Sequence, residues 1–448
     1  MMPWRREISR AQWKCLFAAQ LGWMLDGMDI MLYAFALSAI RAEFHLGSAQ
    51  AGGLASLTLV ASAFGGLLFG VLADRIGRAR ALVWSILTYS VFTAAMATAH
   101  SIPELILWRT LVGLGLGGEW SAGSVLVSET WPAAHRGKAI GFMQSGWAIG
   151  YILAAISAAL VLPQYGWRAL FAIGIAPALL TVWIRRSVPE PEIWKTGRRE
   201  GARGPTTGQG DGLHRWPAAR RGKGQDLRKL VEIFRGPLLR RTVIATLTTT
   251  CVLFGYWGLF TWIPTFLASP VEQGGAGLGL VRSSAWIVPM QIGAFFGYTT
   301  FGFAADRFGR RPTFIAFLLA AAILVPAYCL LGRSATALIL LGPLVGFFGH
   351  GYFSVFGAML AELFPTRIRA TAQGLTYNAG RAVSALAPFT IGALADRAGL
   401  GPALATTSGF FLLGAASIML LPETLGTDLT AGSDLSAPHA TSRREAGS

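Results

Sequence analysis

The chain has 448 residues, of which 53% are apolar and only 13% are charged, with a formal net charge of +16. Soluble domains carry about a quarter charged residues, so this composition excludes an ordinary water-soluble protein and indicates a membrane protein. The three cysteines cannot all pair and show no metal-ligand spacing, which argues against a disulfide framework or a metal site.

Apolar stretches long enough to cross about 30 Å of hydrocarbon as helices occur twelve times along the chain. They lie at residues 15–40, 50–73, 81–99, 104–128, 138–161, 168–186, 240–268, 282–304, 312–331, 335–361, 370–395 and 400–421. Glycines at four-residue spacing, such as Gly113 with Gly117 and Gly146 with Gly150, are expected to let neighbouring helices pack closely. The sequence therefore predicts an all-α integral membrane protein.

The first span contains LDGMD, which places Asp26 and Asp29 in an otherwise uncharged run. The two residues are three apart and share a helical face. At 1.5 Å per residue they lie about 17 and 21 Å from the basic end, near the midplane. An aspartate there costs roughly 2.5 to 3.5 kcal/mol, so it is expected to have a function or a partner. We predict that the pair carries a coupling proton; a structural ion pair with Arg109 or Arg381 is the alternative.

The fourth and fifth spans hold further polar candidates. Arg109 and Glu119 are ten residues apart, or about 280° around a helix, and need not face the same way. Arg109 is either a coupling or a structural residue, and Glu119 either lines a cavity or braces neighbouring helices. Gln144 and Trp147 are candidates for a hydrogen bond and an apolar wall beside a substrate.

Between Arg185 and Arg241 the apolar pattern gives way to a stretch rich in Gly, Arg and Pro that cannot bury a core. We expect a basic cytoplasmic linker at 187–239, as a solvated connector or, alternatively, a lipid-headgroup contact. It would separate an N-terminal six-helix bundle (1–186) from a C-terminal one (240–424). Residues 425–448 are expected to form a disordered cytoplasmic tail.

The tenth and eleventh spans contain a lone histidine and an arginine. His350 is either a packed histidine or a proton relay. Arg381 shares a helical face with Tyr377 and Asn378. A guanidinium offers two parallel N–H groups to a carboxylate, so we predict that these three residues bind the substrate anion. Neutralisation of Asp26 or Asp29 by Arg381 is the alternative.

The two halves of the chain repeat three motifs at a nearly constant offset. GVLADRIGR (70–78) recurs as GFAADRFGR (302–310), ETWPAAHRG (129–137) recurs as ELFPTRIRA (362–370), and the PE at 189 recurs at 422. Each pair sits at the same end of matching spans. This pattern indicates an internal duplication of a six-helix unit.

Together with RTLVGLGLG (109–117), these motifs resemble the major facilitator superfamily. LDGMD and the segment 117–151 resemble its proton-coupled organic-acid symporters, which carry aromatic acids, lactate-type monocarboxylates and sialic acid; YNAGR (377–381) is most similar to the lactate and sialic acid branch. The resemblance implies twelve transmembrane helices in two pseudo-symmetric six-helix bundles, and a part for Arg109 in proton coupling with the first-span acids.

The same resemblance implies that the loop motifs form charge networks that hold the cytoplasmic side shut while the carrier faces outward. Their residues are Gly70, Asp74, Arg75, Gly77, Arg78, Glu129 and Arg136 in the first half, and Asp306, Arg307, Gly309, Arg310, Glu362 and Arg369 in the second.

Basic residues are distributed unevenly between the two sides of the predicted membrane. Of the 38 lysines and arginines, 31 fall in the termini and loops on one side and five on the other. This asymmetry places both termini in the cytoplasm of a cell with the chain in its inner membrane. Topology therefore explains the excess positive charge, and we expect no nucleic-acid partner.

The sequence contains no phosphate-binding loop, no catalytic constellation and no His/Cys cluster, so we expect neither an enzyme nor a metal or organic cofactor. We predict proton-coupled uptake of a small organic anion, a monocarboxylate or aromatic acid, by alternating access in a monomer within the lipid bilayer. A sugar or polyol symporter, and a membrane receptor, are the alternatives.

Overall fold

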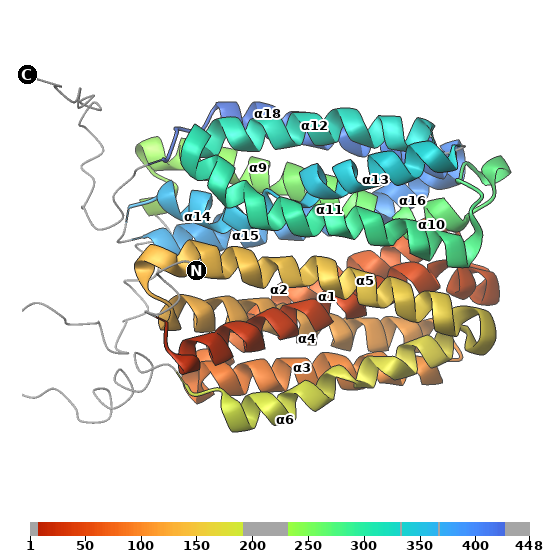
Figure 1. The fold of residues 1–448 in the computed structure, drawn as a ribbon, viewed down its shortest axis with the longest axis horizontal. Coiled ribbons are helices and arrows are strands. Elements are labelled where there is room, and N and C mark those ends of the chain that lie inside the picture. Colours follow the sequence, from red (N-terminus) through yellow and green to blue (C-terminus); the bar gives the residue numbers. More distant parts are fainter. Residues whose placement is uncertain (1–7, 191–231, 332–333, 366–367, 426–448) are drawn as a thin grey trace, which may run out of the picture.

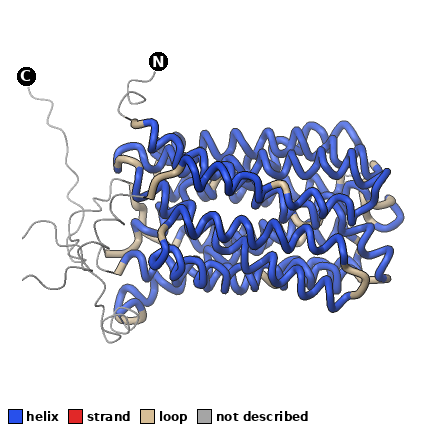
Figure 2. The backbone as a smooth tube through the Cα atoms, turned by 90° about the horizontal axis from the view of Figure 1, so that it is seen from below, coloured by secondary structure: helices blue, strands red, loops and turns tan. Residues whose placement is uncertain are grey.

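The computed structural model describes residues 8–190, 232–331, 334–365 and 368–425. Within these ranges the chain is all-helical, and the helices run side by side along one long direction (Figure 1). A view turned by 90° shows the connecting loops mainly at the two ends of the bundle (Figure 2). Eight helical stretches in the described residues are long and apolar enough to cross a membrane.

The N-terminal half covers the first six predicted spans. Ser9 begins the first helix with a reciprocal capping box to Gln12, and Ser101 caps the fourth. The fifth and sixth predicted spans meet at Gly166, where the backbone turns to a φ of 73° within the helix Ala133–Ala172. The helices are α1 (Arg10–Phe44), α2 (Ser48–Ile76), α3 (Arg78–Ala95), α4 (Ile102–Thr130), α5 (Ala133–Ala172) and α6 (Pro177–Ser187).

The C-terminal half covers the other six spans, and four of them are divided into two helices. The helices are α9 (Gly236–Phe260), α10 (Ile263–Ala268), α11 (Gly279–Phe308), α12 (Arg310–Leu330), α13 (Ala335–His350), α14 (Phe353–Glu362), α15 (Arg369–Ser384), α16 (Ala387–Ala398), α17 (Leu400–Ala405) and α18 (Thr407–Met419). Pro264 and Pro388 lie at the start of the helices that follow two of these breaks, where a missing N–H is tolerated.

The two halves lie side by side as two helical bundles, and they touch mainly through α2 with α16 and α5 with α11 (Figure 1). This arrangement confirms the predicted twelve-span, two-bundle fold. The described chain begins and ends on the same side of the bundle, at the left in Figure 1, which is called the terminus side below.

Close helix approach inside the N-terminal half depends on the predicted glycines. A Cβ atom at Gly117 would lie 1.9 Å from the carbonyl oxygen of Ser62 on α2, and one at Gly150 would lie 1.8 Å from that of Met24 on α1. Only a residue without a side chain fits at these contacts, as the spacing predicts. The glycines therefore fix the distances of α4 from α2 and of α5 from α1.

Candidate functional site

Four ionisable side chains are buried inside the N-terminal half, on α1 and α4. Asp26 and Asp29 are 2% and 1% exposed, and Arg109 and Glu119 are 2% and 1% exposed. The predicted coupling residues thus lie on one pair of helices, α1 and α4. Both helices are long and apolar, so these residues lie inside the membrane.

Antiparallel packing of α1 and α4 brings Arg109 and Glu119 against the same helix at two levels. The guanidinium of Arg109 lies 4.2 Å from the centre of the Tyr33 ring, a cation–π contact. The carboxyl group of Glu119 lies against Gly22, where a Cβ atom would be 2.4 Å from Oε1. Both residues therefore face α1. For Glu119, this position is compatible with both predicted roles, lining a cavity and bracing neighbouring helices.

The aspartates form no ion pair within 4.0 Å with Arg109 or Arg381 among the residues that the structure describes. Both carboxyl oxygens of Asp29 and one of Asp26 are buried without a hydrogen-bond partner in the same residues. A structural ion pair with either arginine, one of the predicted alternatives, is absent from this state. Carboxyl groups buried in this way are costly unless a proton or another cation compensates them.

Arg381 on α15 reaches across the interface between the halves. Its Nη2 donates a hydrogen bond to the Ser62 hydroxyl oxygen on α2, over 2.7 Å. Tyr377 lies one turn before Arg381 on the same helix. The amide nitrogen of Asn378 instead bonds the carbonyl oxygen of Gly374 in its own helix, over 2.9 Å. The predicted substrate-binding arginine thus lies where the two bundles meet.

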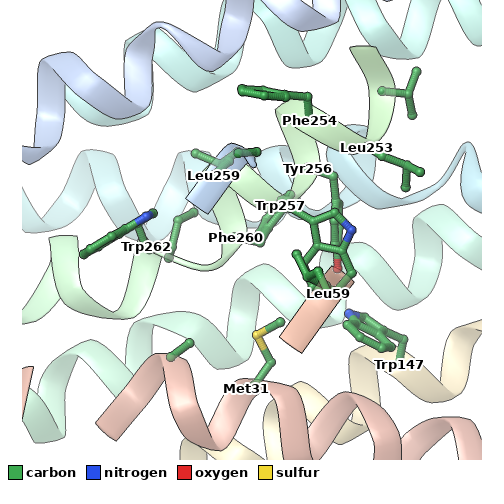
Figure 3. Close-up of a cluster of buried hydrophobic side chains, with 14 of the residues drawn as sticks. Met31, Leu59, Trp147, Leu253, Phe254, Tyr256, Trp257, Leu259, Phe260 and Trp262 are labelled. Atoms are coloured by element: carbon green, nitrogen blue, oxygen red, sulfur yellow. The ribbon is translucent and has the colours of Figure 1, made fainter. Parts of the chain in front are cut away.

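Aromatic rings from both halves meet beside α1. Trp147 on α5 lies with its ring centre 4.9 Å from that of Trp23 and 5.9 Å from that of Trp257, the latter edge to face. Figure 3 shows the Trp147 indole beside Trp257 and Tyr256 of α9. Gln144, one turn before Trp147, is 9% exposed, and its Oε1 has no hydrogen-bond partner in the described part of the chain. The predicted apolar wall is therefore part of an inter-bundle aromatic cluster.

His350 packs against the part of this cluster that belongs to the C-terminal half. Its ring is fully buried, with ring centres 4.1 Å from Phe260, 5.1 Å from Tyr256 and 5.9 Å from Tyr298. Its Nδ1 lies 3.1 Å from the carbonyl oxygen of Gly346. The ring is packed and hydrogen-bonded, which agrees with the first of the two alternatives for this residue.

The loop motif of the N-terminal half joins α2 to α3 on the terminus side. Gly77 ends α2 with a φ of 115°, a conformation that favours glycine. Arg78 then forms a two-pronged ion pair with Glu129 at the end of α4, over 2.9 and 3.0 Å. Arg75 is exposed, and open space surrounds Gly70. The side chains of Asp74 and Arg136 lie outside the part of the chain that the structure describes.

The C-terminal half repeats this geometry. Gly309 ends α11 with a φ of 103°. Arg310 contacts both Asp306 and Glu362, the latter over 3.6 Å. Arg307 lies over the Phe308 ring, and Arg369 donates to the carbonyl oxygen of Phe364. In both halves these ion pairs lie within one bundle.

Two glutamates that were not singled out in the sequence complete the loop motifs. Glu190 accepts hydrogen bonds from the backbone N–H groups of Ala79 and Arg80, each over 3.2 Å. Glu423 accepts from Arg310 and Arg311, over 2.9 and 3.1 Å. Each glutamate therefore caps the helix that starts after the glycine turn, at its positive end. The repeated PE dipeptide was the signal for this pair.

Asp396 at the end of α16 was also missed. Its two carboxylate oxygens accept hydrogen bonds from the backbone N–H groups of Ser48 and Ala49, in the first turn of α2, each over 2.9 Å. The contact joins the halves on the side opposite the termini. Its signal was a third copy of the loop motif, because LADRIG (72–77) recurs as LADRAG (394–399). Gly399 ends α16 with a φ of 84°, as Gly77 ends α2.

Comparison with known proteins places these features in a family. The model of the Major Facilitator Superfamily matches residues 21–299 and 276–434. A probable 4-methylmuconolactone transporter of Cupriavidus pinatubonensis is 35% identical over 434 residues, which cover 95% of this chain and 94% of the relative. A cis,cis-muconate transport protein of Acinetobacter baylyi is 34% identical, with 92% and 93% covered. An inward-open structure of the xylose transporter XylE from E. coli shares the fold, with a TM-score of 0.71 at 18% identity and 93% and 98% covered.

Proposed function

The chain belongs to the major facilitator superfamily and is a transporter, and on that premise we propose that it takes up a small organic anion together with protons. The substrate class is a monocarboxylate or an aromatic acid. Two relatives are named for the transport of muconate and of a muconolactone, which are small unsaturated acids or their cyclic esters. An organic anion as substrate therefore agrees with the transport named for the relatives and with the positive charge of Arg381 at the interface.

One observation carries this proposal: Arg381 stands at the interface between the halves without an ion pair to the buried acids of α1. Its guanidinium donates to Ser62 of the other half, and no ion pair within 4.0 Å joins it to either aspartate in the described residues. An arginine so placed can hold a carboxylate through two parallel N–H bonds. The acids of α1 remain available for the coupling proton.

Alternating access would follow from rocking of the two bundles about this site. The proton would load on Asp26 or Asp29, and the substrate carboxylate would bind Arg381. Arg109 and Glu119 would link the acids to α4, while Tyr377, Asn378, Gln144 and Trp147 would line the substrate. The charged loop networks around Arg78 and Arg310 would hold the terminus side shut in the outward-facing state.

The orientation and organisation proposed for the chain follow the distribution of its basic residues. We place the terminus side in the cytoplasm of a cell whose inner membrane holds the chain. The two bundles at 1–186 and 240–424 would be joined by a linker at 187–239, which lies largely outside the described residues, as does the tail at 425–448. A monomer contains every residue of the proposed site.

Uptake into proteoliposomes with the external pH below the internal pH tests the proposal. The panel contains lactate, pyruvate, benzoate, cis,cis-muconate, sialic acid and glucose. We expect accumulation of at least one carboxylate above equilibrium, and loss of accumulation when a protonophore collapses the gradient. Accumulation of glucose alone would establish the sugar-type alternative instead. Binding without accumulation of any compound in the panel would indicate a receptor.

A further inference from the structure

The aromatic cluster continues from the interface to the breaks in the C-terminal helices. His350 is the last residue of α13, Tyr256 lies one turn before the end of α9, and Arg381 lies one turn before the end of α15. All three therefore stand next to a helix break. In transporters, discontinuous helices near the midplane form the substrate and ion sites.

A chain of aromatic rings connects Arg381 with His350. Tyr377 lies one turn before Arg381, and its ring centre is 6.4 Å from that of Phe356. The ring of Phe356 is 6.4 Å from that of Phe353, which in turn lies 5.0 Å from Tyr256. The Tyr256 ring lies 5.1 Å from that of His350 and 5.2 Å from that of Trp257. Trp257 in turn contacts Trp147 of the N-terminal half (Figure 3). His350 and Arg381 thus lie at two ends of one aromatic wall.

The hydrogen bond of His350 fixes which of its nitrogens can bind a ligand. The carbonyl oxygen of Gly346 can only accept, so Nδ1, at 3.1 Å, must carry the proton of that bond. In the neutral ring, Nε2 is then a hydrogen-bond acceptor. Nε2 is buried and has no partner among the residues that the structure describes. A buried acceptor of this kind favours a ligand that brings a donor.

We infer that His350 determines specificity: its Nε2 accepts a hydrogen bond from a hydroxyl or N–H group on the ring of a planar carboxylate whose acid group binds Arg381. The aromatic side chains of Trp147, Trp257 and Tyr256 supply the wall for the ring, where offset or edge contacts are favourable. Hydroxylated aromatic acids are therefore preferred over the unsubstituted acids. This inference rests on the proposed function, because it assumes that Arg381 holds the carboxylate.

Substitutions of His350 test the hydrogen-bonding roles of its two ring nitrogens separately. In His350→Asn, the short amide can still donate to Gly346 but places no acceptor where Nε2 stands. In His350→Gln, the longer amide can offer its oxygen near that place. Tyr328→Phe is the matched control, because Tyr328 is also almost fully buried and also has an oxygen without a partner in the described residues. It lies on α12, with its ring centre 6.3 Å from that of Phe266.

The test compares proteoliposome uptake of benzoate with its 3- and 4-hydroxy and its 3- and 4-methoxy derivatives. For at least one ring position, the wild type should favour the hydroxy compound over benzoate and the methoxy compound by about three- to tenfold, the value of one hydrogen bond. His350→Asn should remove this preference, His350→Gln should restore part of it, and Tyr328→Phe should keep it. The ratio of two substrates in one preparation does not depend on the amount of folded protein.

Two results would overturn the inference while the proposed function stands: a wild type that takes up benzoate and its methoxy derivatives as well as the hydroxy compounds, or an unchanged preference in His350→Asn. The first result needs only the wild type, so it tests the inference even if the His350 variants do not fold. A wild type that transports no carboxylate at all would instead overturn the proposed function.

Discussion

At the scale of single residues, the two aspartates of α1 are buried, and three of their four carboxyl oxygens lack a hydrogen-bond partner in the described residues. Asp26→Asn together with Asp29→Asn removes the groups that would carry the proton but keeps the side-chain volume. We expect the double variant to exchange labelled substrate across the membrane while it no longer concentrates substrate under a pH gradient, since coupling requires a titratable group. Counterflow and gradient-driven uptake measure the two properties separately.

Glu104→Gln is the control for this pair, because Glu104 lies in the first turn of α4 at the membrane edge and accepts a hydrogen bond from the backbone of His100. It should leave both properties as in the wild type. Undiminished accumulation by the double aspartate variant would contradict the coupling role.

Arg381 is predicted to act through its fork of N–H groups as well as its charge. Arg381→Lys keeps the charge but loses the two parallel bonds, whereas Arg381→Gln loses both. The KM for the carboxylate should rise in both variants, by about ten- to a hundredfold in Arg381→Gln, the value of a charge-assisted bond. Initial uptake rates over a range of substrate concentrations give this KM.

The KM of the Arg381→Gln variant distinguishes a substrate contact from a structural one. If Arg381→Gln leaves the KM unchanged and only lowers the amount of protein in the membrane, then Arg381 stabilises the interface through Ser62 and does not bind the substrate.

At the scale of helices, glycine contacts set how closely neighbouring elements approach. Gly117→Ala places a methyl group 1.9 Å from the carbonyl oxygen of Ser62, so α2 and α4 must move apart. We expect this change to destabilise the protein by about 1 to 3 kcal/mol. Gly409→Ala in α18 adds the same methyl group where nothing lies within 4 Å, and should be neutral or stabilising by up to about 1 kcal/mol.

Thermal unfolding of both glycine variants in the same detergent provides the comparison. Equal unfolding temperatures for Gly117→Ala and Gly409→Ala would show that α2 and α4 can separate at no cost, which contradicts their packing through Gly117.

The first turns of α3 and α12, which follow the two glycine turns, are capped in the same way in both halves. Glu190 and Glu423 occupy equivalent positions after their bundles and cap equivalent helices, α3 and α12, through two backbone N–H groups each. A Cβ atom at Gly77 or Gly309 would collide with the capping carboxylate, so glycine is required there for space as well as for conformation. The duplication that is visible in the sequence is thus a duplication of hydrogen-bond geometry.

At the scale of the whole molecule, the halves are joined on the side opposite the termini. Asp396 bonds the first turn of α2, and the N–H of Phe389 donates to the hydroxyl oxygen of Ser56, over 3.2 Å. Tyr151 donates to the carbonyl oxygen of Phe260, which joins α5 to α9. These contacts join the two bundles directly.

Loss of the Asp396 contact is expected to open that side more often. Asp396→Ala leaves two N–H groups of α2 without their acceptor and should raise the open population by about three- to tenfold, since the contact is solvent-exposed and of modest net strength. The alkylation rate of a cysteine introduced at Ser56, in a chain whose native cysteines are replaced, reports this opening. Arg397→Ala, one residue further along the exposed end of α16, should leave the rate unchanged.

An equal alkylation rate in the Asp396→Ala variant and in its parent would show that apolar packing between α2 and α16 alone keeps the side shut. Gly52 and Gly392, whose positions abut the backbone of the partner helix, would then be the residues that hold it.

The sequence established the spans, the repeat and the burial of Asp26, Asp29 and Arg109, because hydropathy, spacing and charge act within a single helix and its immediate solvent. It could not establish their partners. Arg109 lies on Tyr33 and forms no ion pair with the aspartates in the described residues, and Asp396 contacts α2. These partners depend on rotation about each helix axis and on the separation between helices, which are set by packing between residues far apart in the chain. The inter-bundle aromatic wall that ends at His350 exists only in the tertiary structure, for the same reason.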